Sequence, residues 1–269
     1  MTPPANLGPE VLDPFLPQSF HSMRQLARLL ALVFLPVVVR GAPTFDPPEQ
    51  PVFKRDKAGH PDTRFMTRHQ GYVAIAAKGG VDLLLMGDFL TDDFRGNNRN
   101  GVPAIYERAF GRYRPANFGQ GGDYTQHVLW RLQNGELDGI TPRVMMLMIG
   151  GTNGSNGEPG ERIAEGVKAI IACVRQKSPG TKILLLSVLP WDANPGSRRD
   201  RHVAVNQHLP ALDDGGKTVK YVDISRKFLA PDGTIPKDLM PDGAHLSDKG
   251  YQMWADAVEA PLRALMQSP

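Results

Sequence analysis

Four short apolar runs, separated by longer segments of helical pattern, constrain the fold of this chain more than any other feature. We expect strands at 82–86, 143–149, 181–188 and 218–223, and a further short strand before Asn117. Helices are expected near 66–78, 102–110, 124–133, 159–177, 199–212 and 248–267. Apolar runs of this length suit strands buried on both faces, and their alternation with helices is typical of a doubly wound parallel sheet. The sequence therefore predicts an α/β fold.

Two polar segments are expected at the carboxyl edge of the sheet, where ligands bind in folds of this type. The first expected strand ends in Gly87-Asp88. Far downstream, Asp242 and His245 stand three residues apart in a turn before the last helix. An Asp beside a His is the base half of a catalytic triad, because the carboxylate sets the tautomer of the imidazole and stabilises the imidazolium that forms. This spacing also occurs often by chance, so it is weak evidence when taken alone.

Two glycine-containing segments lie between these positions, at 117–123 (NFGQGGD) and 148–153 (MIGGTN). Glycine allows a backbone N–H to approach a reacting oxygen closely, and an asparagine amide can add a second donor. Together they could form an oxyanion hole. Taken singly, each is more simply explained as a loop or a turn.

The combination is more specific than its parts. In this order, GDFLT at 87–91, GGD at 121–123, GTN at 151–153 and D-x-x-H at 242–245 resemble the blocks of the SGNH or GDSL hydrolases. Segments 117–123, 125–132, 134–137, 234–242 and 245–251 are similar to the branch that contains the catalytic subunits of platelet-activating-factor acetylhydrolase. The resemblance extends from about residue 65 to residue 267.

The resemblance implies a three-layer α/β/α sandwich with a central parallel sheet, of the flavodoxin-like SGNH-hydrolase type. It also implies hydrolysis of small acyl or acetyl esters, on lipids, sugars or synthetic substrates, without a metal or organic cofactor. By resemblance, a serine at position 89 attacks the acyl carbon, His245 takes its proton and Asp242 orients His245. The oxyanion would be held by the backbone N–H at 89, the N–H of Gly122 and the side chain of Asn153.

This chain departs from the pattern at the nucleophile, where Phe89 follows Gly87 and Asp88. A benzyl group has no lone pair to attack a carbonyl and no proton to give up. Loss of a triad nucleophile typically lowers turnover by about a million-fold. Thr91 and Ser155 are alternative hydroxyls near the site, but neither is on the turn that presents the nucleophile. Since Ser and Phe codons can differ by one pyrimidine transition, Phe89 can also reflect a recent mutation or a sequence error.

A second departure is an extra glycine in the third block, which reads Gly150-Gly151-Thr152-Asn153. A bulge could absorb it, or it could move Asn153 off its target and put Thr152 in its place. Two functions stay open: a carboxylic-ester hydrolase, and a catalytically silent pseudoenzyme that binds an acylated sugar or lipid.

Composition agrees with one enzyme-sized domain. The chain has 269 residues, 41% hydrophobic and 22% charged, and a net charge of +3 with acidic residues interspersed, so no nucleic-acid footprint is expected. Cys173 is the only cysteine, which excludes an intramolecular disulfide and a cysteine zinc cluster. Its place in a helical pattern predicts a core position or a helix face.

The N-terminus resembles a secretory leader. From Met23, a basic start precedes an eleven-residue apolar stretch at 29–39, too short to span a bilayer, with a cleavage position after Gly41. We therefore expect a leader at 1–42 with a signal peptide from Met23 to Gly41, a proline-rich connector at 43–64 and the hydrolase-like domain at 65–269. The protein would be secreted or periplasmic with no stable membrane span. A homodimer stays open, since subunit pairing is known for the resembled branch.

Overall fold

The computed structural model describes residues 45–96 and 101–268. In this part of the chain, five parallel strands form one sheet in the order β2-β1-β3-β4-β5. The sheet starts from β1 and grows outward in both directions, as in a doubly wound fold. The strands lie within one or two residues of their expected positions: β1 Leu83–Gly87, β2 Pro115–Asn117, β3 Val144–Met148, β4 Lys182–Leu186 and β5 Val219–Val222.

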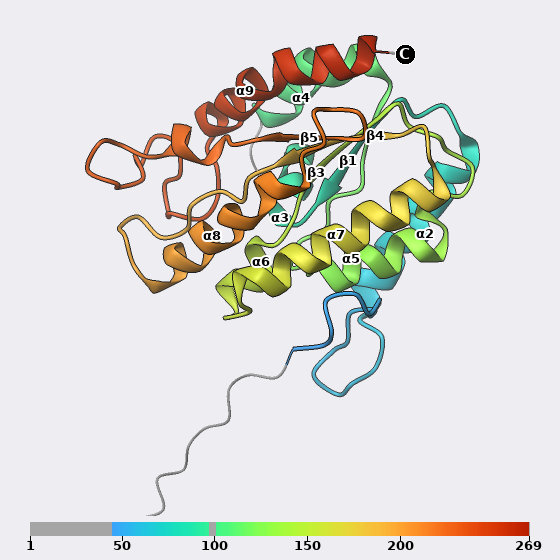
Figure 1. Ribbon diagram of the computed structural model, residues 1–269, viewed down its shortest axis with the longest axis horizontal. Coiled ribbons are helices and arrows are strands. Elements are labelled where there is room, and N and C mark those ends of the chain that lie inside the picture. Colours follow the sequence, from blue (N-terminus) through green and yellow to red (C-terminus); the bar gives the residue numbers. More distant parts are fainter. Residues whose placement is uncertain (1–44, 97–100, 269) are drawn as a thin grey trace, which may run out of the picture. The chain divides into compact units, whose positions relative to one another are not determined.

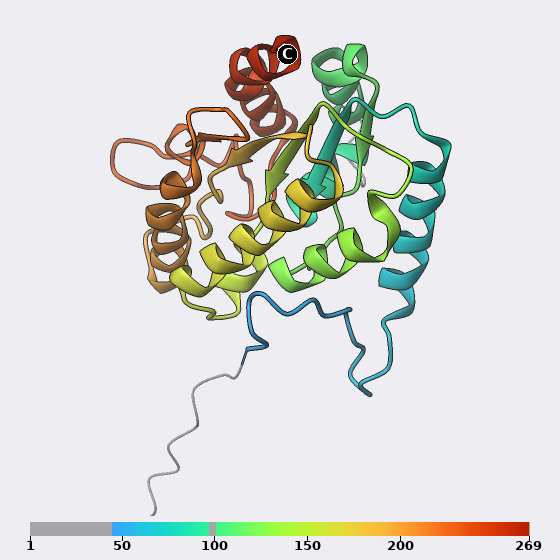
Figure 2. The same cartoon turned by 45° about the vertical axis from the view of Figure 1, so that its right-hand side comes forward.

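Helices cover both faces of the sheet (Figure 1). On one face lie α4 (Val102–Phe110) and α9 (Asp248–Gln267). The opposite face carries α2 (Thr63–Lys78), α5 (Thr125–Arg131), α7 (Gly160–Lys177) and α8 (Ser197–His208). In the turned view, the sheet lies between these two groups (Figure 2). The predicted three-layer α/β/α sandwich is therefore confirmed.

The alternation of side chains along each strand builds the two cores. In β1, Leu83 and Leu85 face α4 and α9, while Leu84 and Met86 face the opposite helix layer. All four side chains are fully buried. Complete burial of a leucine stabilises a fold by roughly 1.5–3 kcal/mol relative to exposure, so a strand that is apolar at every position gains on both faces. Cys173 lies in the second of these cores, on α7, as predicted.

The carboxyl ends of the strands carry short elements that were not predicted. A one-turn helix, α3 (Phe89–Asp92), begins directly after β1. Another, α6 (Gly151–Ser155), begins after β3. Gly150 has a φ of 115°, which favours glycine and turns the chain from the strand into α6. Both short helices bring residues of the sequence blocks to the same edge of the sheet.

Residues 45–62, in the predicted connector, form turns and a bridge between Arg55 and Pro61, and they contact this edge. The backbone N–H of Val52 donates to the carbonyl of Gln126 at 3.2 Å. Lys54 Nζ donates to the carbonyl of Gly121 at 3.1 Å, and Asp62 caps α2 by accepting from Phe65 N at 2.7 Å.

The proposed signal peptide, from Met23 to Gly41, lies outside the described residues. Within the described ranges, no helix has the length and apolarity needed to cross a membrane.

Candidate active site

Phe89 is the first residue of α3 and stands at the carboxyl end of β1. Asp88 caps this helix by accepting a hydrogen bond from Leu90 N at 3.3 Å. The Phe89 ring makes edge-to-face contacts with His245, at 5.1 Å between ring centroids, and with Trp191, at 5.3 Å. The structure therefore brings position 89 and His245 together, although they are far apart in the sequence.

Asp242 and His245 form a hydrogen-bonded pair. His245 Nδ1 lies 2.7 Å from Asp242 Oδ2, and Asp242 Oδ1 accepts from the backbone N–H groups of His245, at 2.7 Å, and Ala244, at 2.9 Å. Although partial burial raises the pKa of Asp242, these hydrogen bonds outweigh it and lower the pKa to about 2. A carboxylate that is ionised at neutral pH favours a proton on Nδ1 and leaves Nε2 of His245 as the acceptor.

Gly243 holds this turn in place. Its φ is 74°, and a Cβ at this position would lie 2.6 Å from the backbone nitrogen of Ala193. Only a glycine allows this approach without a shift of backbone. The loop after β4 is thereby packed against the Asp242–His245 turn, which also places Trp191 beside Phe89.

Asp88 joins the first sequence block to the third. Its side chain is buried, and Thr152 Oγ1 lies 3.5 Å from Asp88 Oδ2. Burial raises the pKa of Asp88 to about 7, helped by the nearby Asp123 and opposed by hydrogen bonds from Leu90 and Thr152. Thr152, one residue before the expected donor, is thus the member of the third block that contacts the first.

Asn153 has a different environment from the one expected. Its side chain is fully buried, and Nδ2 donates to Glu158 Oε2 at 2.7 Å and to Gln126 Oε1 at 3.1 Å. The amide oxygen accepts from Thr125 N at 3.1 Å. Since an amide has only two hydrogens to donate, the side chain has none left for an oxyanion. In the described structure the Asn153 amide is therefore committed to this network, and its place in the oxyanion hole stays a prediction.

The two glycines of the second block, Gly121 and Gly122, have different neighbours. A Cβ placed on Gly121 would lie 3.7 Å from Phe89 Cβ, whereas one on Gly122 would lie 2.7 Å from Lys54 Nζ. Gly121 N donates to Asp92 Oδ2 at 3.1 Å. Gly121 therefore borders position 89, and Gly122, the residue inferred from the family pattern, lies next to the ammonium group of Lys54.

The two alternative hydroxyls have contrasting positions. The Thr91 side chain is buried against the backbone of β1, because a Cβ on Gly87 would lie 2.2 Å from Thr91 Oγ1. Ser155 is half-buried, and its Oγ lies 3.1 Å from His202 Nε2. Thr91 is therefore closed off from substrate, while Ser155 is not.

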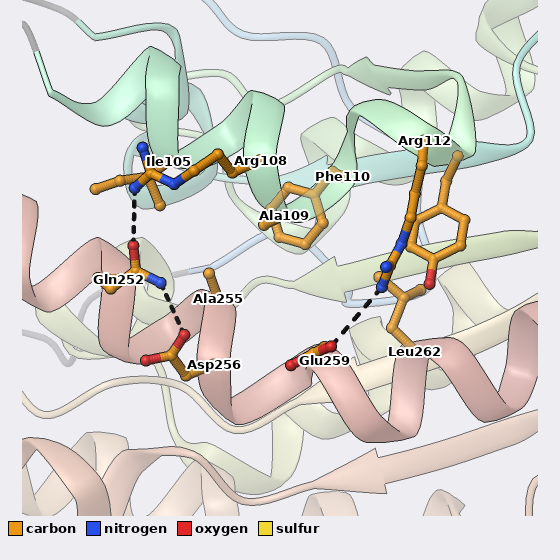
Figure 3. Close-up of a pocket in the computed structure, with 11 residues that line it drawn as sticks. Ile105, Arg108, Ala109, Phe110, Arg112, Gln252, Ala255, Asp256, Glu259 and Leu262 are labelled. Carbon is orange, nitrogen blue, oxygen red and sulfur yellow. Dashed lines mark hydrogen bonds and ion pairs between the residues drawn. The ribbon is translucent and has the colours of Figure 1, made fainter.

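A groove of about 200 Å³ between α4 and α9 is separate from this site (Figure 3). Its walls are joined by Arg108 to Gln252, at 3.1 Å, and by Arg112 to Glu259, at 3.9 Å. None of its lining residues belongs to the four sequence blocks. Among residues 45–96 and 101–268, no group of three His, Cys, Asp or Glu side chains is placed to hold a metal ion.

The arrangement of these blocks agrees with the comparison to known proteins. Residues 85–253 match the GDSL-like lipase/acylhydrolase family. The chain belongs to this family. It is 32% identical over 221 residues to the platelet-activating factor acetylhydrolase IB subunit alpha1 of Homo sapiens, which covers 82% of this chain and 91% of that protein. The alpha2 subunit of Rattus norvegicus is 34% identical over 190 residues, covering 71% of this chain and 80% of that protein.

Solved structures of GDSL proteins share the fold. A GDSL-like lipase from Bacteroides thetaiotaomicron superposes with a TM-score of 0.57 at 15% identity and covers 73% of this chain and 97% of its own. The predicted resemblance to GDSL hydrolases, and to the acetylhydrolase branch, is confirmed. Sequence reasoning missed Lys54, Trp191 and His202. Of these, Trp191 lies in the loop that follows β4 at the binding edge, and this position could have marked it.

Proposed function

We propose that this GDSL-family protein retains an ester-binding site but is silent in acyl transfer at the Asp242–His245 pair, because Phe89 occupies the nucleophile's position. The contact between the Phe89 and His245 rings supports this proposal most directly. In a triad, the hydroxyl of the nucleophile donates its proton to the imidazole at this place. Here the neighbour of the imidazole is an aromatic ring that has no such proton.

The ligand we propose is a small acyl ester carried on a lipid or a sugar. The matched relatives are named as acetylhydrolases of a lipid mediator, which favours an acetyl group on a lipid. The rings of Phe89 and Trp191 offer an apolar surface beside His245, and such a surface suits an acyl chain better than a charged group. The protein would then bind the ester and present it to another molecule without cleaving it.

An active carboxylic-ester hydrolase is the second candidate. It is favoured by the 2.7 Å hydrogen bond between His245 and Asp242, which retains the base half of a triad. This candidate requires a serine at position 89 in the natural gene, so resequencing of the gene decides whether Phe89 is native. A serine codon there would replace the silent-site proposal with this one.

The activity test is hydrolysis of p-nitrophenyl acetate by the full chain. The native protein is compared with Phe89→Ser, with Phe89→Ala and with the double variant Phe89→Ser/His245→Ala. Phe89→Ala is the matched control, because it opens the same space without adding a nucleophile. We expect turnover that depends on His245 only in Phe89→Ser.

The Asn153 side chain donates elsewhere, so one oxyanion-hole donor is absent, and this limits the rate expected of Phe89→Ser. A complete triad contributes about a million-fold, and the loss of one oxyanion-hole donor costs about a hundred- to a thousand-fold. We therefore expect the His245-dependent rate of Phe89→Ser to exceed that of the native chain by about a thousand-fold. Native turnover that is lost in His245→Ala would refute the silent site, and equal rates in Phe89→Ser and Phe89→Ala would refute the proposed role of position 89.

A further inference from the structure

A serine–histidine contact lies between α6 and α8. Ser155 Oγ is 3.1 Å from His202 Nε2. The serine is half-buried at the end of α6, whereas the histidine ring is buried within α8. An imidazole at hydrogen-bond distance from a reachable serine hydroxyl is the arrangement that activates a serine nucleophile.

His202 is oriented for this role by backbone carbonyl groups. Its Nδ1 lies 2.8 Å from the carbonyl oxygen of Leu189, so a proton on Nδ1 is the favoured neutral form. In that form, Nε2 accepts the hydroxyl proton of Ser155. Nε2 also lies 3.1 Å from the carbonyl oxygen of Gly151, which can accept from it only after Nε2 has gained a proton. The same nitrogen therefore has a suitable partner before and after proton transfer.

The surroundings favour a neutral base and a polarised serine. Burial lowers the pKa of His202, the two carbonyl contacts oppose this, and the positive charges of Arg201 and Arg198 add to it. The ring is then a neutral proton acceptor at pH 7. Arg201 Nε donates to the carbonyl of Gly154, the residue before Ser155, at 2.6 Å, so a guanidinium group lies near this part of α6. A positive charge there stabilises the negative charge that develops on a reacting oxygen.

We propose that Ser155 and His202 form a nucleophile–base pair that reacts with small activated acyl and phosphonyl groups, independently of Asp242 and His245. In the acyl reaction, Ser155 Oγ bonds to the carbonyl carbon of p-nitrophenyl acetate while its proton moves to His202 Nε2. The bond to p-nitrophenolate then breaks, the proton on His202 passes to water, and an acetyl-serine is left. With a fluorophosphonate, Ser155 Oγ bonds to phosphorus, fluoride leaves, and the proton on His202 passes to water.

The pair is connected to the Phe89 site through one side chain. The Trp191 ring makes edge-to-face contacts with His202, at 5.8 Å, and with Phe89, at 5.3 Å. The Trp191 indole therefore lies between His202 and a small ester bound at Phe89. Because the two sites are so close, only mutation can distinguish their reactivities. The test therefore removes the reactive residue of each site in turn.

The test is labelling of the full chain with a fluorophosphonate, followed by intact mass measurement and peptide mapping. We expect one label, on Ser155, which Ser155→Ala abolishes and His245→Ala leaves unchanged. Ser225 is the matched control, because it is also half-buried but has a carboxylate partner, Asp223 at 2.6 Å, in place of an imidazole. Ser155 should react faster than Ser225 by about a hundred-fold, the low end of what a general base contributes.

A second pair of variants tests the histidine without altering the buried ring. In Ser155→Cys, His202 should assist ionisation of the new thiol, so alkylation by iodoacetamide at pH 6 should be at least about ten times faster than in Ser225→Cys. Background from the native cysteine is small, because burial raises the pKa of the Cys173 thiol. No label on Ser155, or equal alkylation of the two engineered cysteines, would overturn the proposal. A label that disappears in His245→Ala would do so as well.

Discussion

His245 lies between two different partners: the Phe89 ring at 5.1 Å on one side and the Asp242 carboxylate at 2.7 Å on the other. The second contact is the base half of a triad, and under the proposed function the first puts an aromatic ring where a proton-donating hydroxyl would stand. An aromatic pair of this kind contributes about 0.5–1.5 kcal/mol, so the ring also helps to hold the imidazole in position. The pair can therefore persist without catalysis, because packing and hydrogen bonds maintain it.

The acidity of Asp242 is the first property that can be measured. Its pKa of about 2 arises because three hydrogen bonds outweigh the effect of partial burial. His245→Ala removes the ring donor and leaves the two backbone donors, so we expect the pKa to rise toward 3.8 without reaching it. Carboxyl NMR titration gives this value, with Asp232 as the unaffected control, since its lowered pKa depends on Thr234. The stability that Asp242 contributes is present above about pH 4 and is lost as the pH falls through 2. A native value near 3.8 would mean that the pair is not formed in solution.

Asp88 should give the opposite dependence of stability on pH. Its folded pKa of about 7 exceeds the ordinary value of 3.8, so the folded state holds a proton that the unfolded state releases. The free energy of unfolding therefore decreases as the pH rises from about 4 to 7. Asp88→Asn mimics the protonated form, and we expect it to raise the free energy of unfolding at pH 8 by about 1–3 kcal/mol.

Urea denaturation at pH 5 and pH 8 measures this difference. At pH 5 the advantage of Asp88→Asn should shrink, since the native carboxyl is then protonated in the fold. Asp82→Asn is the control, because it breaks an exposed ion pair with Arg114, at 2.6 Å, that solvent screens. If Asp88→Asn destabilises the protein equally at both pH values, the buried carboxyl is ionised and its pKa is not raised.

Arg131 is a buried charge on which two carboxylates depend. It donates to Asp123 at 2.8 Å and to Glu136 at 2.6 Å, and none of the three side chains is exposed. Arg131→Met would leave two buried carboxylates without their cation, so we expect a loss of about 3–5 kcal/mol in the free energy of unfolding. The exposed counterpart, Arg114→Met, should cost much less, because solvent screens its ion pair with Asp82. Chemical denaturation of both variants decides the point, and a similar small loss in each would contradict the buried network.

The fold could be predicted from the sequence because short local patterns of apolar residues indicate its strands. Runs such as 83–86 and 144–148 are apolar at every position, and such runs fit strands with helices on both sides. The pairing of Asp242 with His245 could be predicted for the same reason, since a spacing of three residues brings both to one turn. The contact of Phe89 with Trp191 could not, because it depends on how two loops meet at the sheet edge. Ser155 and His202 are 47 positions apart in the sequence and meet through the packing of α6 against α8. No local sequence pattern predicts a contact over that separation.

The buried position of the Asn153 side chain yields a prediction about the rescued enzyme. Asn153 donates both amide hydrogens into a buried network with Glu158 and Gln126, so in the Phe89→Ser background we expect Asn153→Ala to leave the His245-dependent turnover within about threefold. The same change should lower the free energy of unfolding by about 2–3 kcal/mol, because buried polar groups lose their partners. Thr152→Val is the companion variant, since Thr152 is the residue that contacts Asp88. If Asn153 instead supplied the oxyanion donor, its removal would cost about a hundred- to a thousand-fold in turnover. Rates measured well below the unfolding temperature of each variant separate the two outcomes, and a fall confined to Thr152→Val would show that the extra glycine has moved the donor position to Thr152.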